Sequence, residues 1–147
     1  MEGARQGSLH WRDTLHGERY DQLARVLETE DLDFVQLNYS IIERDAERRL
    51  LPLAADKRIA VLVNRPFAAG GLFSRLHGKP LPPWAEEIGC ASWSQFLLKF
   101  VISHPAVTCA IPATSKVQHL TDNMQAGVGT LPDGGMRERM ARYVAEL

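Results

Sequence analysis

Two hydroxyl side chains and a lysine stand between a short apolar segment and the beginning of a helical pattern. The apolar segment is 107–111, the polar side chains are Thr114, Ser115 and Lys116, and the helical pattern covers 116–126. The first turn of a helix offers free N–H groups and the positive end of the helix dipole, and both attract phosphate. The pattern therefore predicts a phosphate site. Taken in isolation, it more often means a helix capped by Ser115 with a solvated lysine.

Two more polar side chains lie in, or directly after, segments that are typical of strands. Gln36 is in the middle of the aromatic and β-branched run 34–39. Burying its amide costs free energy unless the amide finds two or three hydrogen-bond partners, so a plain core role is costly. Arg65 follows the apolar run 59–63 and is suited to pair with a phosphate through two hydrogen bonds. A surface arginine has the same pattern, so both roles stay open for Arg65.

The other reactive residue types predict no further site. Cys90 and Cys109 make neither a disulfide framework nor a CxxC metal pair, and Cys109 is expected to be an inert thiol in a buried strand. The charged run 47–49 is expected to form a solvated helix face, and Trp84 and Trp93 to anchor the core or a loop. We predict no metal site and assign no catalytic residue.

Composition limits the class of protein. The chain has 147 residues, 45% hydrophobic and 24% charged, which fits one globular domain. Its net charge of −1 gives no general attraction to nucleic acid or to anionic membranes. No apolar run approaches the roughly 20 residues that span a bilayer. We therefore expect neither nucleic-acid nor membrane partners, and the scarcity of cysteine suits the reducing cytoplasm.

Strands alternate with helices along the sequence. After an irregular lead-in over 1–18, we expect strands at 34–39, 59–63 and 107–111, a loop over 64–83, and helices at 20–27, 45–57, 93–103, 116–126 and 136–144. Pro52 means that the second helix either begins close before it or kinks there. This alternation predicts βαβ units with right-handed crossovers and a parallel sheet. The continuous apolar run 59–63 is typical of a strand covered on both faces.

Three groups of segments, in their order and spacing, resemble the C-terminal half of the aldo/keto reductases. The first is DFVQLNYS (33–40) followed by LLPLA (50–54), and the second is VNRPF (63–67) with GGL (70–72). The third runs from SWSQ (92–95) through IPATSK (111–116) to DN (122–123), and the resemblance covers about Tyr20 to Gly129. It implies an α/β fold, the C-terminal half of a (β/α)8 TIM barrel, with three to four parallel strands and helices on their convex side. The lead-in, 1–18, would then precede an NADP-dependent oxidoreductase domain, 19–147.

The resemblance also implies which residues bind a dinucleotide, NADP(H) or else NAD(H). Gln36 and Asn64 take the positions next to the nicotinamide, and Arg65, Pro66 and Phe67 begin the loop over the pyrophosphate. Thr114, Ser115 and Lys116 take the positions at the 2′-phosphate, and His119 stands where many members have arginine. Asp122 and Asn123 take the positions at the adenine.

The family's catalytic Asp, Tyr, Lys and His precede the region that this chain matches. The resemblance therefore implies the cofactor-binding half of a carbonyl reductase, inactive alone, with an N-terminal half-barrel or a second copy of the chain as partner. A non-catalytic nucleotide-binding or interaction module, and a truncated gene product, are the alternatives. Neither the carbonyl substrate nor the natural start of the chain follows from the sequence.

Overall fold

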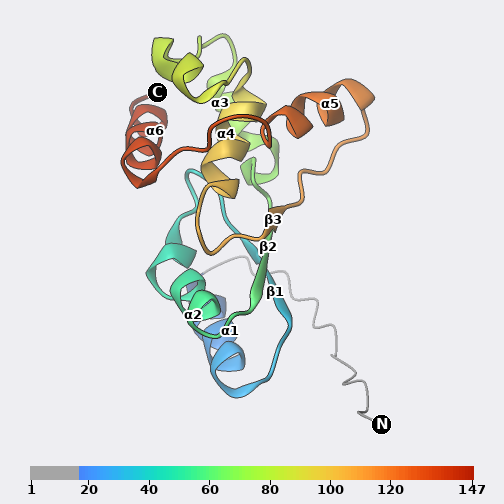
Figure 1. Ribbon diagram of the computed structural model, residues 1–147, viewed down its shortest axis with the longest axis vertical. Coiled ribbons are helices and arrows are strands. Elements are labelled where there is room, and N and C mark those ends of the chain that lie inside the picture. The colour runs from blue at the N-terminus through green and yellow to red at the C-terminus, as the bar shows by residue number, and fades with distance from the viewer. Residues whose placement is uncertain (1–16) are drawn as a thin grey trace.

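The computed structural model describes residues 17–147 as an α/β structure (Figure 1). Of the lead-in expected over 1–18, residues 1–16 lie outside this range and 17–18 begin the first helix. The strands are β1 (Phe34–Asn38), β2 (Ala60–Asn64) and β3 (Cys109–Ala110). The α-helices are α1 (Gly17–Thr29), α2 (Leu50–Asp56), α3 (Gly71–Leu76), α4 (Trp93–Ile102), α5 (Val117–Gln125) and α6 (Gly134–Glu146). Short 3-10 helices are η1 (Asp45–Arg48), η2 (Ala68–Gly70) and η3 (Pro83–Ile88).

The three strands form one parallel sheet in the order β1-β2-β3, as predicted. Gln36 pairs in register with Leu62, which in turn pairs with Cys109, so these three residues form one row across the sheet. The third strand is shorter than 107–111, although the amide of Ile111 still donates to the carbonyl of Val63 at 2.9 Å. All three carboxyl ends therefore lie at the same edge of the sheet.

One face of the sheet is covered and the other is open. Side chains that alternate along β1 and β2 are no more than 5% exposed and join the hydrophobic core: Val35, Leu37, Val61 and Val63. On the opposite face Phe34 is 41% exposed, and Gln36 and Leu62 are only partly buried. The helices thus cover a single face, as expected for a barrel wall. The expectation that 59–63 is covered on both faces is wrong for this chain, because Leu62 and its neighbours Phe34 and Gln36 on the second face stay partly or largely accessible.

The core lies between the covered face and α4. Ser92 caps α4, since its hydroxyl accepts a hydrogen bond from the amide of Gln95 at 3.1 Å, as the sequence predicts. Phe96 is completely buried, and its ring lies 5.6 Å from Trp84 and 5.3 Å from Trp93, measured between centroids. Both tryptophans are therefore core anchors. At the other end of the molecule α1 and α2 lie side by side (Figure 1).

Local details differ from the expected elements in two places. The helix expected over 45–57 is broken at Arg49, and α2 begins at Leu50, so Pro52 falls in the first turn, where its missing N–H costs nothing. The loop expected over 64–83 contains η2 and α3, because Leu72 and Leu76, one helical turn apart, are both buried in the core. Short helices of this length have too few residues to show a period in the sequence.

The expectation that Cys109 is buried is also wrong, since its side chain is exposed. It shares a row with Leu62 on the open face, and β3 is an edge strand of two residues. An apolar sequence context does not bury a side chain when no segment packs over that face. Cys90, in contrast, is buried, and burial raises the pKa of its thiol to about 11.

Replacing Leu37 and Leu62 one at a time will measure the asymmetry of the sheet. Leu37 is fully buried, so Leu37→Ala is expected to cost about 2–5 kcal/mol of unfolding free energy. Leu62 points to the open face from the neighbouring strand. Leu62→Ala is therefore expected to lower the unfolding free energy by less than about 1 kcal/mol. Chemical denaturation of both variants decides it. Equal losses would mean that the open face is covered in solution.

Candidate functional site

The predicted nicotinamide residues meet on the open face of the sheet. The side-chain amide of Gln36 donates a hydrogen bond to Oδ1 of Asn64, and the two residues lie on neighbouring strands. Both are partly buried and stand toward the carboxyl edge. Parallel strands bring their carboxyl ends together, and in α/β folds this edge is where ligands bind. The structure therefore brings Gln36 and Asn64 together through one hydrogen bond between their side-chain amides.

The segment after β2 is tightly wound. Arg65, Ala68 and Ala69 have φ values of 50°, 50° and 54°, in the left-handed region that non-glycine residues rarely adopt. The turn is held by a hydrogen bond from the amide of Ala68 to the carbonyl of Arg65, at 2.8 Å. Such conformations cost about 1–3 kcal/mol each and gather at ligand-binding segments.

Arg65 keeps hydrogen-bonding capacity in this turn. Its Nη2 lies 3.8 Å from a carboxylate oxygen of Glu43, a long ion pair. Its buried Nε has no hydrogen-bond partner among residues 17–147. Next to it Pro66 is buried, and the ring of Phe67 packs 4.7 Å from that of Phe73. Arg65 therefore keeps a buried donor that no residue of 17–147 uses, on a segment where Pro66 and Phe67 are packed.

The segment after β3 is exposed almost throughout. Thr114, Ser115, Lys116 and His119 are all exposed to solvent. Ser115 does not cap α5, which corrects the prediction. The hydroxyl of Thr114 instead accepts a hydrogen bond from the amide of Lys116, at 3.3 Å, and the N-terminus of α5 has no side-chain cap. The first N–H groups of α5 therefore remain available to an outside ligand.

Asp122 and Asn123 lie on α5 but differ in their surroundings. Asp122 accepts hydrogen bonds from the hydroxyl of Ser92 and from the side-chain amide of Gln95, and both donors lie near the N-terminus of α4. Asn123 is only 7% exposed. Neither residue projects freely into solvent, in contrast to His119 on the same helix.

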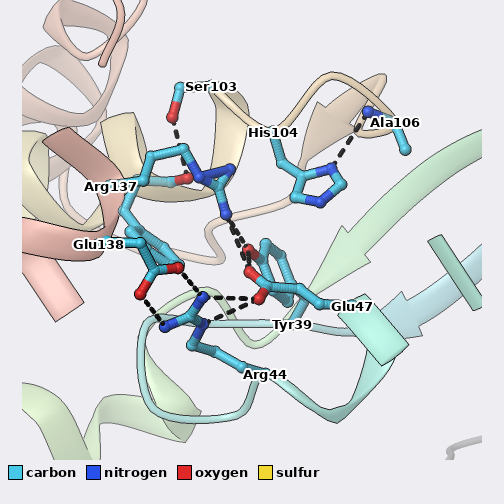
Figure 2. Close-up of polar contacts among 9 residues, drawn as sticks. Tyr39, Arg44, Glu47, Ser103, His104, Ala106, Arg137 and Glu138 are labelled. Carbon is cyan, nitrogen blue, oxygen red and sulfur yellow. Dashed lines mark hydrogen bonds and ion pairs between the residues drawn. The ribbon is translucent and has the colours of Figure 1, made fainter. Parts of the chain in front are cut away.

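A polar cluster that the sequence did not indicate joins β1, η1 and α6 (Figure 2). Arg137 on α6 donates from Nη2 to the hydroxyl of Tyr39 and to a carboxylate oxygen of Glu47, the latter at 2.9 Å. Tyr39 also donates to Glu47, and Arg44 binds the second oxygen of that carboxylate at 2.7 Å. The guanidinium of Arg137 lies over the ring of Phe100, 4.6 Å from its centroid.

These contacts shift the pKa of two members of the cluster. Burial, then the hydrogen bond to Glu47, raises the pKa of Tyr39. Burial alone would raise the pKa of Glu47, but hydrogen bonds from Arg44 and Tyr39, together with the charge of Arg137, lower it below its ordinary value. The prediction that residues 47–49 form a solvated helix face is therefore wrong for Glu47. It holds for Arg48, whose side chain is 86% exposed. The cluster joins residues up to 98 positions apart, so no local pattern could have indicated it.

Comparison with known proteins decides the family. The sequence model of the Aldo/keto reductase family matches residues 17–138. The chain belongs to the aldo/keto reductase family. Two solved structures with a similar fold are the holo and apo forms of aldo-keto reductase AKR11C1 from Bacillus halodurans. Each is 19% identical, with a TM-score of 0.63 over 84% of this chain. No match was found among the curated proteins.

The chain spans about half the length of these solved aldo-keto reductases, 46% of the holo and 47% of the apo chain. The predicted fold, part of a (β/α)8 barrel with three parallel strands, is therefore confirmed. In such barrels, inward side chains of the strands fill the interior, and active sites lie at the carboxyl ends. The open face that carries Gln36, Leu62 and Cys109 is thus the side that faces inward in a complete family member.

Two further facts concern other classes of site. Within residues 17–147, no helix is both long and apolar enough to cross a bilayer. In the same range no three His, Cys, Asp or Glu side chains gather in a way that could hold a metal ion.

The carboxylate of Glu47 is expected to make stability depend on acidity. A folded-state pKa below the ordinary 4.5 gives stability that is present above that value and lost as the pH falls through the folded pKa. Glu47→Gln should therefore lose less unfolding free energy than the parent between about pH 5 and pH 3. Chemical denaturation across this range measures it, with Glu86→Gln, at an exposed position, as the control. An unchanged slope in Glu47→Gln would contradict the pKa shift.

Proposed function

We propose that this chain is the NADP(H)-binding half of a carbonyl-reducing aldo/keto reductase barrel and is inactive alone. The observation that supports it most is the position of the predicted residues. Three separate segments carry suitable groups: an amide pair lies on β1 and β2, a guanidinium with an unpaired donor follows β2, and an exposed lysine lies between β3 and α5. A dinucleotide phosphate carries matching groups: a carboxamide, a pyrophosphate and a 2′-phosphate.

The residues present fit such a cofactor. We assign Gln36 and Asn64 to the nicotinamide carboxamide, because exchanging their mutual hydrogen bond for bonds to the ligand leaves neither amide unpaired. We assign Arg65 to the pyrophosphate, because its buried Nε lacks a partner within residues 17–147. Thr114, Ser115 and Lys116 are assigned to the 2′-phosphate at the uncapped start of α5. When bound, the cofactor supplies a hydride to the carbonyl carbon.

The two best-placed tyrosines do not replace the missing proton donor. The hydroxyl of Tyr20 donates to the carbonyl of Asn38 at 3.2 Å, and that of Tyr39 donates to Glu47. Burial raises the pKa of both phenols, which makes each a weaker acid. Neither phenol is therefore suited to donate a proton to a carbonyl oxygen, and this supports the proposal that the half is inactive alone.

We propose an N-terminal half-barrel as partner. Each helix of a (β/α)8 barrel follows its strand and covers the groove toward the next strand. Here α2 packs on β2 and α4 on β3, but α5 contacts α4 and has no following strand to cover. Its outer side carries exposed apolar residues at helical spacing: Val117 (78%), Leu120 (51%), Met124 (67%) and, just beyond its end, Val128 (60%). We call these four residues the α5 stripe.

A second copy of the chain fits less well than a half-barrel. Two copies would supply six strands, whereas about eight are needed to form a barrel whose interior side chains just fill. The free edge of β3 also offers only two ladder residues, so a β1–β3 ladder between copies would be short. Two free thiols, one of them exposed, suit the reducing cytoplasm, where we place the protein.

The purified chain is expected to oxidise no NADPH in the presence of aldehydes. General-acid catalysis contributes on the order of 10²–10⁴-fold, and the chain lacks a matched donor. Absorbance of NADPH with a panel of aldehydes measures the rate. Steady consumption that disappears in Tyr39→Phe or Tyr20→Phe would overturn inactivity and identify the acid.

Dinucleotide binding is expected to depend on Lys116. A charged hydrogen bond is worth roughly 1.5–3 kcal/mol, so Lys116→Ala should weaken NADP binding about ten- to a hundredfold. NAD, which lacks the 2′-phosphate, should lose little. His119→Arg should strengthen NADP binding by adding a second cation on α5.

Calorimetric titration of both dinucleotides tests this, with Lys57→Ala as the matched control. Lys57 is an exposed lysine at the end of α2, shortly before β2 begins, and therefore on the amino side of the sheet and away from the proposed site. If the parent and Lys116→Ala bind NADP equally well, the phosphate assignment is wrong.

A further inference from the structure

Both carboxylate oxygens of Asp122 are already engaged within the protein. Oδ2 accepts a hydrogen bond from the hydroxyl of Ser92 at 2.7 Å, and Oδ1 accepts one from the side-chain amide of Gln95 at 2.6 Å. These are short distances for hydrogen bonds to a charged acceptor, and the two donors come from one turn of α4. Asp122 therefore faces the N-terminus of α4.

The two donors are themselves fixed by the cap of α4. The hydroxyl of Ser92 accepts from the amide of Gln95 at 3.1 Å, and Oε1 of Gln95 accepts from the amide of Ala91 at 2.8 Å. Gln95 is only 7% exposed, so its side chain has little freedom to turn away. A carboxylate at this place also interacts favourably with the positive end of the helix dipole.

The position of α5 depends on a few polar contacts of this kind. Within α5 only Asn123 is buried, and Ala126 is buried just after it, while the α5 stripe faces outward. Beyond the helix, the fully buried Lys99 donates to the carbonyls of Val128 and Thr130, at 2.7 and 3.0 Å. Because little apolar surface holds α5, the Asp122 contacts are a large part of its attachment.

We propose that Asp122 is a positioning residue and does not contact adenine. It holds α5 on α4 and thereby fixes the direction of the first turn of α5, which Lys116 precedes. The adenine 6-amino group then meets no carboxylate from this residue, and Asp122 gives no discrimination between adenine and hypoxanthine. This inference rests on the proposed function for its ligand and departs from the adenine role that the family resemblance implies.

An exchange of the two polar groups tests the positioning. Gln95→Glu sets two carboxylates against each other, and the amides of α5 should then exchange with solvent about tenfold faster. Adding Asp122→Asn restores one amide and one carboxylate in swapped places, so the double variant should return to within about threefold of the parent. Hydrogen exchange of residues 117–125 measures both without any ligand. Exchange rates that do not respond to Gln95→Glu, or no recovery in the double variant, would overturn the proposal.

Nucleotide binding tests the adenine part. Adenosine 2′,5′-bisphosphate and inosine 2′,5′-bisphosphate differ at the 6-position of the purine, and the parent should bind both within about threefold. Both should weaken in Gln95→Glu and recover in the double variant. An adenosine preference of tenfold or more that disappears in Asp122→Asn would show an adenine contact and overturn the proposal. If neither nucleotide binds the parent, the proposed function fails, and hydrogen exchange still decides whether Asp122 holds α5.

Discussion

Burial of a single face of three parallel strands is the constraint on which the other features depend. Val35, Leu37, Val61 and Val63 pack into a core that α4 closes. Because parallel strands need crossover helices, and because these helices all lie on one side, the strand ends meet at one edge. The two segments that follow β2 and β3 therefore begin at the same edge, although their first residues, Arg65 and Ile111, are 46 positions apart in the sequence. The opposite face keeps its side chains accessible.

Buried polar groups act together with apolar packing to hold the C-terminal third of the chain. Arg137 ties α6 to Tyr39 and Glu47, Lys99 holds the segment after α5, and Asp122 holds α5 itself. A buried polar group that lacks a hydrogen-bond partner lowers the free energy of unfolding. When all its partners are present, the group favours one arrangement of the helices over others. Such groups set the orientation of helices whose apolar contacts alone would allow several positions.

Periodicity and capping residues predicted the elements that make many repeated contacts. The parallel strands, the Ser92 cap of α4 and the start of α2 close before Pro52 followed from local pattern and stereochemistry. What failed depended on neighbours distant in sequence. Cys109 is exposed because it lies on an edge strand of two residues, and Glu47 is partly buried because Arg137, 90 residues away, binds it. The candidate site was predicted from the family resemblance, whereas the engagement of Asp122 by Ser92 and Gln95 became visible only in the structure.

The α5 stripe and the outer edges of β1 and β3 also determine how an isolated half behaves during synthesis. Neither edge pairs with another strand among residues 17–147. Unpaired edges and apolar stripes pair with whatever complementary surface arrives first, including other unfolded or half-folded chains. Under the half-barrel proposal, assembly is therefore a kinetic competition. The rate of meeting the complementary half grows with the concentration of that half, and the rate of aggregation grows with the concentration of this chain. A complementary half on the same polypeptide would win that competition through its high effective concentration, and a separate one would have to be made in excess or close by.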